Sequence, residues 1–231
     1  MSNPRRNEPF VGRTDRAAQA SSDSDLTPRT DRRDGVDTRA EPAVPAGDGF
    51  AAYLDRILPG PGSRVDQVSQ RLQVVIGSVT EAAGGRLALR ALRGNSWLGH
   101  PAHPIVVTIP IGAWVVSSWY DLKSARSGQA HDATIADATL AVGIVGAVFA
   151  AATGIAQFVG TRGQTRRETA VHAALNNAAL TLNIVSFGLR RRDNRRLARV
   201  LSAAALATVG ASGYLGGDLT YRHRVGVTTV S

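Results

Sequence analysis

ATLAVGIVGAVFAAATGIAQFVGT, residues 138–161, is a run of apolar and small residues without a single charge. At about 1.5 Å of rise per helical residue, a run of this length crosses the roughly 30 Å hydrocarbon core of a bilayer. Three further runs resemble it: residues 104–120 and 200–217 carry no charge, and residues 170–189 carry only His172 as an ionisable group. An ionised side chain costs roughly 2.5–3.5 kcal/mol at the centre of a spanning helix. Because charges stop at the edges of all four runs, the pattern predicts four transmembrane helices.

The connections between these runs are short, which predicts that successive helices are antiparallel neighbours in an up-and-down bundle. Small residues at a spacing of four in the second run, Gly146, Ala150 and Gly154, allow helix backbones to approach closely. We therefore predict an all-α, four-span transmembrane domain over residues 99–227.

Two different segments precede this domain. Residues 1–50 are rich in Arg, Asp, Ser, Thr, Pro and Gly, and such a segment buries too little apolar surface to offset its ordering entropy, which predicts a disordered tail. A docking arm for a partner is the alternative. In residues 51–98, Ser63 is placed to cap a helix. Apolar residues then recur on one face of that helix: Val65, Val68, Leu72, Val75, Ile76 and Val79.

A second short helix should follow the Gly84-Gly85 pair, with Arg86, Arg90 and Arg93 along one side. Neither segment is long enough to span, so we predict amphipathic helices at the membrane surface over residues 51–98. Packing of the pair on the cytosolic end of the bundle is the alternative.

The net charge of +9 comes almost entirely from arginine. The excess lies in clusters beside the apolar runs, which favours anionic lipid headgroups and argues against nucleic acid as the partner. The absence of cysteine excludes disulfides, thiol redox chemistry and cysteine-ligated metal clusters in this chain. The N-terminus has no apolar core of a cleavable signal peptide. Basic residues balance on the two sides of the membrane, and we expect both termini in the cytoplasm.

Polar residues gather at one end of the predicted bundle. With antiparallel spans, the starts of the first and third runs and the ends of the second and fourth lie on the same side. Four of the five histidines therefore converge there, and only His131 lies at the other end. The candidate cofactor-binding residues are His100, His103, His172, Asn176, Asp218 and His223.

Three hypotheses account for this cluster. Imidazoles on facing helices form cofactor sites in bundles, so His100, His103, His172 and Asp218 could ligate a divalent metal, or the histidines a haem b. The cluster could instead bind a quinone or relay protons, since histidine titrates near neutrality. Finally, the histidines could simply cap helices and hydrogen-bond across the bundle.

Several short motifs resemble one known family. They are WLGHPAHP at 97–104, IPIGAW at 109–114, ATG at 152–154, His172 with Asn176, YLGG at 214–217 and VGV at 225–227. In this order they resemble the bacterial membrane family catalogued as domain of unknown function number two-two-three-one. The resemblance covers about residues 95–227 and implies a four-helix membrane domain. Some relatives carry a fused Rieske iron–sulfur domain, which implies a link to electron transfer.

The sequence thus favours a multi-pass protein of the bacterial cytoplasmic membrane, acting as an accessory redox or respiratory protein that holds haem, metal or quinone. It could work with another membrane or redox protein. A non-catalytic scaffold that binds another membrane protein through its small-residue faces is the alternative. A small transporter is third, because the spans lack mid-membrane charges and a clear inverted repeat.

Overall fold

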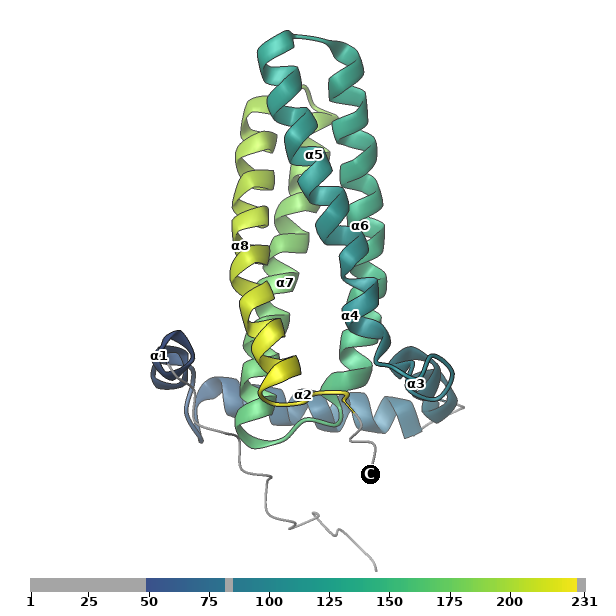
Figure 1. The fold of residues 1–231 in the computed structure, drawn as a ribbon, viewed down its shortest axis with the longest axis vertical. Coiled ribbons are helices and arrows are strands. Elements are labelled where there is room, and N and C mark those ends of the chain that lie inside the picture. The colour runs from purple at the N-terminus through teal and green to yellow at the C-terminus, as the bar shows by residue number, and fades with distance from the viewer. Residues whose placement is uncertain (1–48, 82–84, 228–231) are drawn as a thin grey trace, which may run out of the picture. The chain divides into compact units, whose positions relative to one another are not determined.

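The computed structural model of the protein describes residues 49–81 and 85–227, and the regular secondary structure of this part consists of helices (Figure 1). The predicted tail at residues 1–50 lies outside it, apart from Gly49 and Phe50. The helices are α1 (Phe50–Ile57), α2 (Arg64–Glu81), α3 (Gly85–Arg93), α4 (Ala102–Val106), α5 (Thr108–Ser127), α6 (Ala130–Phe158), α7 (Gly163–Arg190) and α8 (Arg195–Tyr221).

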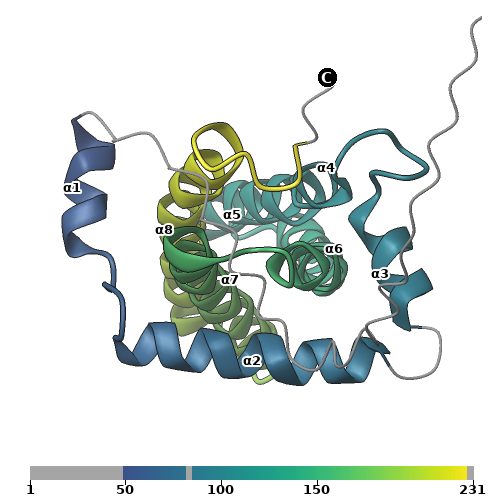
Figure 2. The same ribbon diagram turned by 90° about the horizontal axis from the view of Figure 1, so that it is seen from below.

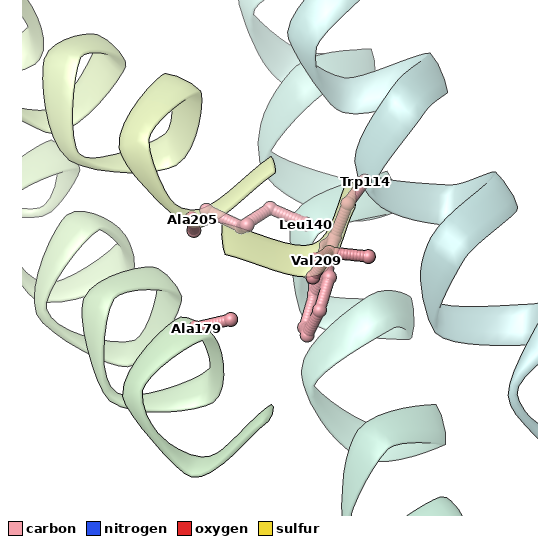
Figure 3. Packing of buried hydrophobic residues seen from close by; sticks show 5 residues of the cluster. All are labelled: Trp114, Leu140, Ala179, Ala205 and Val209. Atoms are coloured by element: carbon pink, nitrogen blue, oxygen red, sulfur yellow. The ribbon is translucent and has the colours of Figure 1, made fainter. Parts of the chain in front are cut away.

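Helices α5 to α8 form an antiparallel bundle. Helix α5 packs along α6 and α7 packs along α8, while contacts of α6 with α7 and of α5 with α8 join the two pairs (Figures 1 and 2). The buried core between them consists mainly of small residues around one indole (Figure 3): Trp114, Leu140, Ala179, Ala205 and Val209. Tight packing of small side chains is how membrane helices attract one another in the absence of a hydrophobic driving force.

The first span passes from α4 to α5 at Val107, whose backbone remains in the α-helical region. Pro110 follows three residues later, and its ring removes an amide donor and crowds the carbonyl four residues before it, at Val106. The boundary between α4 and α5 therefore lies beside the carbonyl that Pro110 crowds, and the two helices together form one apolar segment, Ala102–Ser127. The short helix α4 carries His103.

In the described part of the chain, three helices are long and apolar enough to cross a membrane: Ala102–Ser127, Ala130–Phe158 and Arg195–Tyr221. Helix α7 is just as long, but its inward side carries Glu168, His172, Asn176 and Asn183 and makes it more polar. The prediction of spanning helices is thus confirmed for three of the four runs, and the crossing of α7 stays a prediction.

Helix α2 runs across the base of the bundle beside α7 (Figure 2). The predicted cap is confirmed, because the Asp66 amide donates to Ser63 Oγ at 3.2 Å. The helix binds the bundle through its polar side: Ser69 is fully buried, and Gln73 Nε2 donates to the carbonyls of Phe158 (2.7 Å) and Thr161 (2.8 Å).

Most of the predicted apolar face of α2 remains exposed, namely Val68, Leu72, Val75 and Val79. Placement of this face in the headgroup region stays a prediction.

The bundle consists of two halves that repeat the same contacts. In α4–α6, Ser117 Oγ on α5 donates to the carbonyl of Ala136 on α6 at 2.8 Å. In α7–α8, Ser186 Oγ on α7 donates to the carbonyl of Ala198 on α8, also at 2.8 Å. The helices of the second half run in the same directions as the corresponding helices of the first half, so the repeat is a parallel one. His103 and His172 occupy equivalent places, since each precedes its serine by the same number of residues.

Candidate functional site

His103 on α4 is held by the end of α6. Its Nδ1 lies 2.9 Å from the carbonyl oxygen of Ala150 and 3.1 Å from Thr153 Oγ1. Gly154 leaves room for the ring, because a Cβ at this position would lie 3.1 Å from His103 Cε1. The motif ATG therefore serves to seat an imidazole from the neighbouring helix.

His172 on α7 is held by the end of α8 in the same way. Its Nδ1 lies 2.9 Å from the carbonyl oxygen of Ser212 and 3.0 Å from Ser212 Oγ. Gly216 makes room here, since a Cβ would lie 3.0 Å from His172 Cε1. The glycine of YLGG thus repeats the role of Gly154.

These contacts decide which ring nitrogen carries the proton. A carbonyl oxygen only accepts hydrogen bonds, so Nδ1 of both histidines must be the N–H donor. The neighbouring hydroxyls donate elsewhere: Thr153 Oγ1 to the carbonyl of Ala150, and Ser212 Oγ to the carbonyl of His172. In the neutral rings Nε2 therefore carries a lone pair, which is the arrangement found in metal-ligating histidines.

The two imidazoles meet inside the bundle. Their ring centres are 6.3 Å apart and the ring planes lie at 83°, edge to face. Asn176, one turn beyond His172, donates from Nδ2 to His172 Nε2 at 3.0 Å and to the carbonyl of His172 at 3.0 Å. The structure thus brings three of the candidate residues, His103, His172 and Asn176, into one site.

Two other candidates, Asp218 and His223, form a separate group with Glu168 at the base of the bundle. The ligand atoms of these three residues lie within 4.8 Å of one another. The His223 side chain is fully buried, with Nε2 2.8 Å from Glu168 Oε2 and Nδ1 2.8 Å from Thr165 Oγ1.

Arg222 supplies a positive charge to this second group. Its guanidinium contacts Glu168 at 3.2 Å and Asp218 at 2.7 Å, and forms two 2.7 Å hydrogen bonds with Asp55 of α1. The bonds with Asp55, followed by those with Asp218, raise the pKa of Arg222 above its ordinary value. A fixed cation therefore already offsets part of the negative charge of these carboxylates. His100 belongs to neither group and is exposed in the turn before α4.

The family model described as predicted membrane protein (DUF2231) matches residues 99–229, more than half of the chain. The chain belongs to the DUF2231 family. The resemblance inferred from the motifs is thereby confirmed, and the matched segment includes His103, His172 and the glycines that seat them. Comparison with curated proteins and comparison with solved structures both gave no match.

The DUF2231 bundle has a third polar cluster, at its opposite end. Arg190 on α7 donates from Nη1 to Asp121 on α5 at 3.0 Å and to Asp137 on α6 at 2.9 Å, and its Nη2 also contacts Asp121. Arg195 pairs with Asp137, and Arg199 Nε lies 3.7 Å from Asp121. Arg190 and Asp121 are nearly fully buried.

Sequence reasoning missed this cluster because arginines at span edges are typical of lipid-facing anchors. The repeat was the available signal, since Asp121 follows His103 at the same spacing at which Arg190 follows His172. Glu168 and Arg222 were missed for the same reason, because both stand at the edge of an apolar run.

Proposed function

We propose that His103 and His172 together bind one transition-metal ion, either bare or as the iron of a haem, in an accessory redox protein of the membrane. The observation that carries this proposal is the pair of Nδ1–H···O=C hydrogen bonds, which leave an Nε2 lone pair on each of two adjacent imidazoles. Nitrogen ligands of this kind suit zinc, copper and iron.

The same hydrogen bonds argue against a quinone. A quinone carbonyl needs a hydrogen-bond donor, but in the neutral rings the only N–H group is committed to a backbone carbonyl. The separation also suits a shared ion. The ring centres lie 6.3 Å apart, close enough for both imidazoles to reach one ion through metal–nitrogen bonds of about 2.0–2.1 Å.

Asn176 already contacts one of the two proposed ligand atoms. Its amide occupies the Nε2 lone pair of His172, so ligation requires the amide to turn away. The ion would supply electron transfer or Lewis acidity. The protein would orient the two imidazoles through Ala150 and Ser212 and shield them from water.

The proposal places α7 across the membrane as the fourth span. Its 28 residues match its neighbours in length, and it packs against both α6 and α8. Its buried polar side chains, Asn183 and Ser186 among them, face the interior, where polar groups at membrane depth are tolerated, while Ile184 and Val185 are exposed outward. We further propose that the protein lies in the bacterial cytoplasmic membrane with both termini in the cytoplasm. The reason is that the basic helix α3 lies at the base of the bundle, the end from which α8 leads to the C-terminus, and that the cytoplasmic leaflet is anionic.

Metal analysis with optical spectra tests the proposal. Protein is purified in detergent from cells grown with added iron, zinc or haem precursor, and spectra are recorded oxidised and after dithionite. The expected result is one metal ion or haem per chain, lost in His103→Ala and in His172→Ala but kept in His131→Ala, whose histidine is exposed at the other end. Absence of any stoichiometric metal or haem after supplementation would falsify the proposal.

A further inference from the structure

The inward side of α7 is polar along its entire length. Residues at helical spacing line this side from the base of the bundle to its opposite end: Glu168, His172, Asn176, Asn183, Ser186 and Arg190. Only Ala179 interrupts the series, within the apolar core (Figure 3). A spanning helix gains nothing from such a series if its interior only needs to be packed, because apolar side chains would fill it at lower cost.

Asn183, in the middle of this series, is 1% exposed, and neither Oδ1 nor Nδ2 has a hydrogen-bond partner among the described residues. The indole Nε1 of Trp114, at the equivalent position of the other half, is likewise buried without a partner in that part of the chain. Buried polar atoms in native proteins are satisfied by protein or by ordered water. Two sites with this deficiency at equivalent places in one bundle indicate a common cause.

The indole of Trp114 shares its buried layer with Leu140, Ala179, Ala205 and Val209. Gly143 lets the indole lie close to α6, since a Cβ there would collide with Trp114 Nε1. Trp114 offers a donor, while Asn183 offers both a donor and an acceptor. Water needs two or more such partners to occupy a buried site.

Separate hydrogen-bonded clusters lie on both sides of Asn183 along the bundle. On one side, Ser186 Oγ lies 2.8 Å from Ser202 Oγ and 3.4 Å from Arg190 Nε, and Arg190 binds Asp121. On the other side, Asn176 donates to Nε2 of His172. Asn183 therefore lies between two hydrogen-bonded clusters that reach opposite ends of the bundle.

We propose that Asn183 and Trp114 hold ordered water at the centre of the bundle, and that this water connects the histidine pair with the Asp121–Arg190 cluster as a path for protons. The step is a transfer of protons between hydrogen-bonded groups and involves no oxidant or reductant. It depends on Asn183 and Trp114 and not on a bound metal.

Proton flux into vesicles tests this path. Metal-free protein is reconstituted into phosphatidylethanolamine–phosphatidylglycerol vesicles that contain a pH-sensitive dye, and a potassium gradient with valinomycin drives protons inward. Wild-type vesicles should acidify faster than protein-free vesicles. Asn183→Leu should fall to the protein-free rate, while Asn183→Ser, which keeps a polar group and leaves space for water, should conduct.

Asn177→Leu is the matched control, because Asn177 is exposed on the same helix and donates only to the carbonyl of Ala173. It should conduct like the wild type. Size-exclusion profiles and helix content establish that each variant is folded. A wild-type rate equal to that of protein-free vesicles overturns the proposal, and so does a folded Asn183→Leu that conducts like the wild type. Since the assay uses metal-free protein, failure of the metal proposal leaves its outcome unaffected.

Discussion

His103 and His172 face each other at equivalent positions of the two halves of the bundle, with ring centres 6.3 Å apart. Each ring is held through Nδ1 by a backbone carbonyl four residues before a glycine, Gly154 or Gly216. The two halves are therefore not merely adjacent hairpins. Each half positions one imidazole by the same set of contacts, and the candidate site forms where the two halves meet.

The glycines that seat the rings are the first test. In Gly154→Ala the new Cβ would lie 3.1 Å from His103 Cε1, and in Gly216→Ala 3.0 Å from His172 Cε1. Such overpacking costs about 1–3 kcal/mol and turns the ring, so we expect lower thermal stability and lower metal occupancy. Gly213→Ala is the control, because its Cβ meets nothing within 4 Å. Gly213→Ala should raise the free energy of unfolding by up to about 1 kcal/mol through helix propensity. Equal thermal stability and equal metal occupancy in all three variants would contradict the packing described.

The buried ion pair at the other end gives a second prediction. Arg190→Met leaves Asp121 buried without its bidentate partner, and loss of one member of a buried pair costs about 3–5 kcal/mol. Unfolding in detergent micelles should show this loss, whereas Arg192→Met, at an exposed position, should change stability by less than about 0.5 kcal/mol. The double variant Asp121→Leu with Arg190→Met should recover part of the loss. Unchanged stability of Arg190→Met would contradict the burial of this pair.

The attachment of α2 should depend on pH. The guanidinium of Arg166 donates to Asp66 at 2.8 Å and holds the pKa of this carboxyl below its usual 3.8. Because the pKa is lower in the folded state, the contribution is full at pH values above 3.8 and is lost as the pH falls through the folded value. A spin label at Arg71→Cys should become mobile only under such acid conditions. In Asp66→Asn it should be more mobile throughout, without this acid transition; the same transition in both proteins would exclude Asp66 as its origin.

The number of spans can be measured directly, because the chain has no cysteine. Single cysteines at Gly128, Gly160, Asp193 and Val227 are treated in intact cells with a membrane-impermeant maleimide. If α7 crosses, Gly128→Cys and Asp193→Cys share one accessibility, and Gly160→Cys and Val227→Cys share the opposite one. Equal labelling of Gly160→Cys and Asp193→Cys would place α7 outside the membrane.

Much of the fold follows from local patterns in the sequence. The charge-free runs predict long helices, and Ser63 predicts a cap. The face by which α2 binds was beyond this reasoning. Amphipathicity identifies an apolar face but does not say what covers it, and here Asp66, Ser69 and Gln73 make the contact because polar groups bind a helix end rich in free carbonyls.

The candidate site could be predicted only in part. Antiparallel helices require His103 and His172 to lie at one end, but they do not determine which of the six candidate residues meet. That choice depends on backbone carbonyls, which every residue possesses, and on two glycines whose role appears only when the neighbouring ring is placed. The repeat is hard to detect in the sequence for the same reason, because the contacts that the two halves share involve few specific side chains.

The ligands of the bound metal test the central claim most directly. Protein loaded with the metal found by analysis, or with haem, is prepared with ¹⁵N-labelled histidine and examined by X-ray absorption and, for a paramagnetic state, by electron–nuclear double resonance. We predict two imidazole nitrogens bound to one ion, with one of them lost in His103→Ala and the other in His172→Ala. A protein that binds no metal, or an ion whose signals contain no histidine nitrogen, would contradict the account.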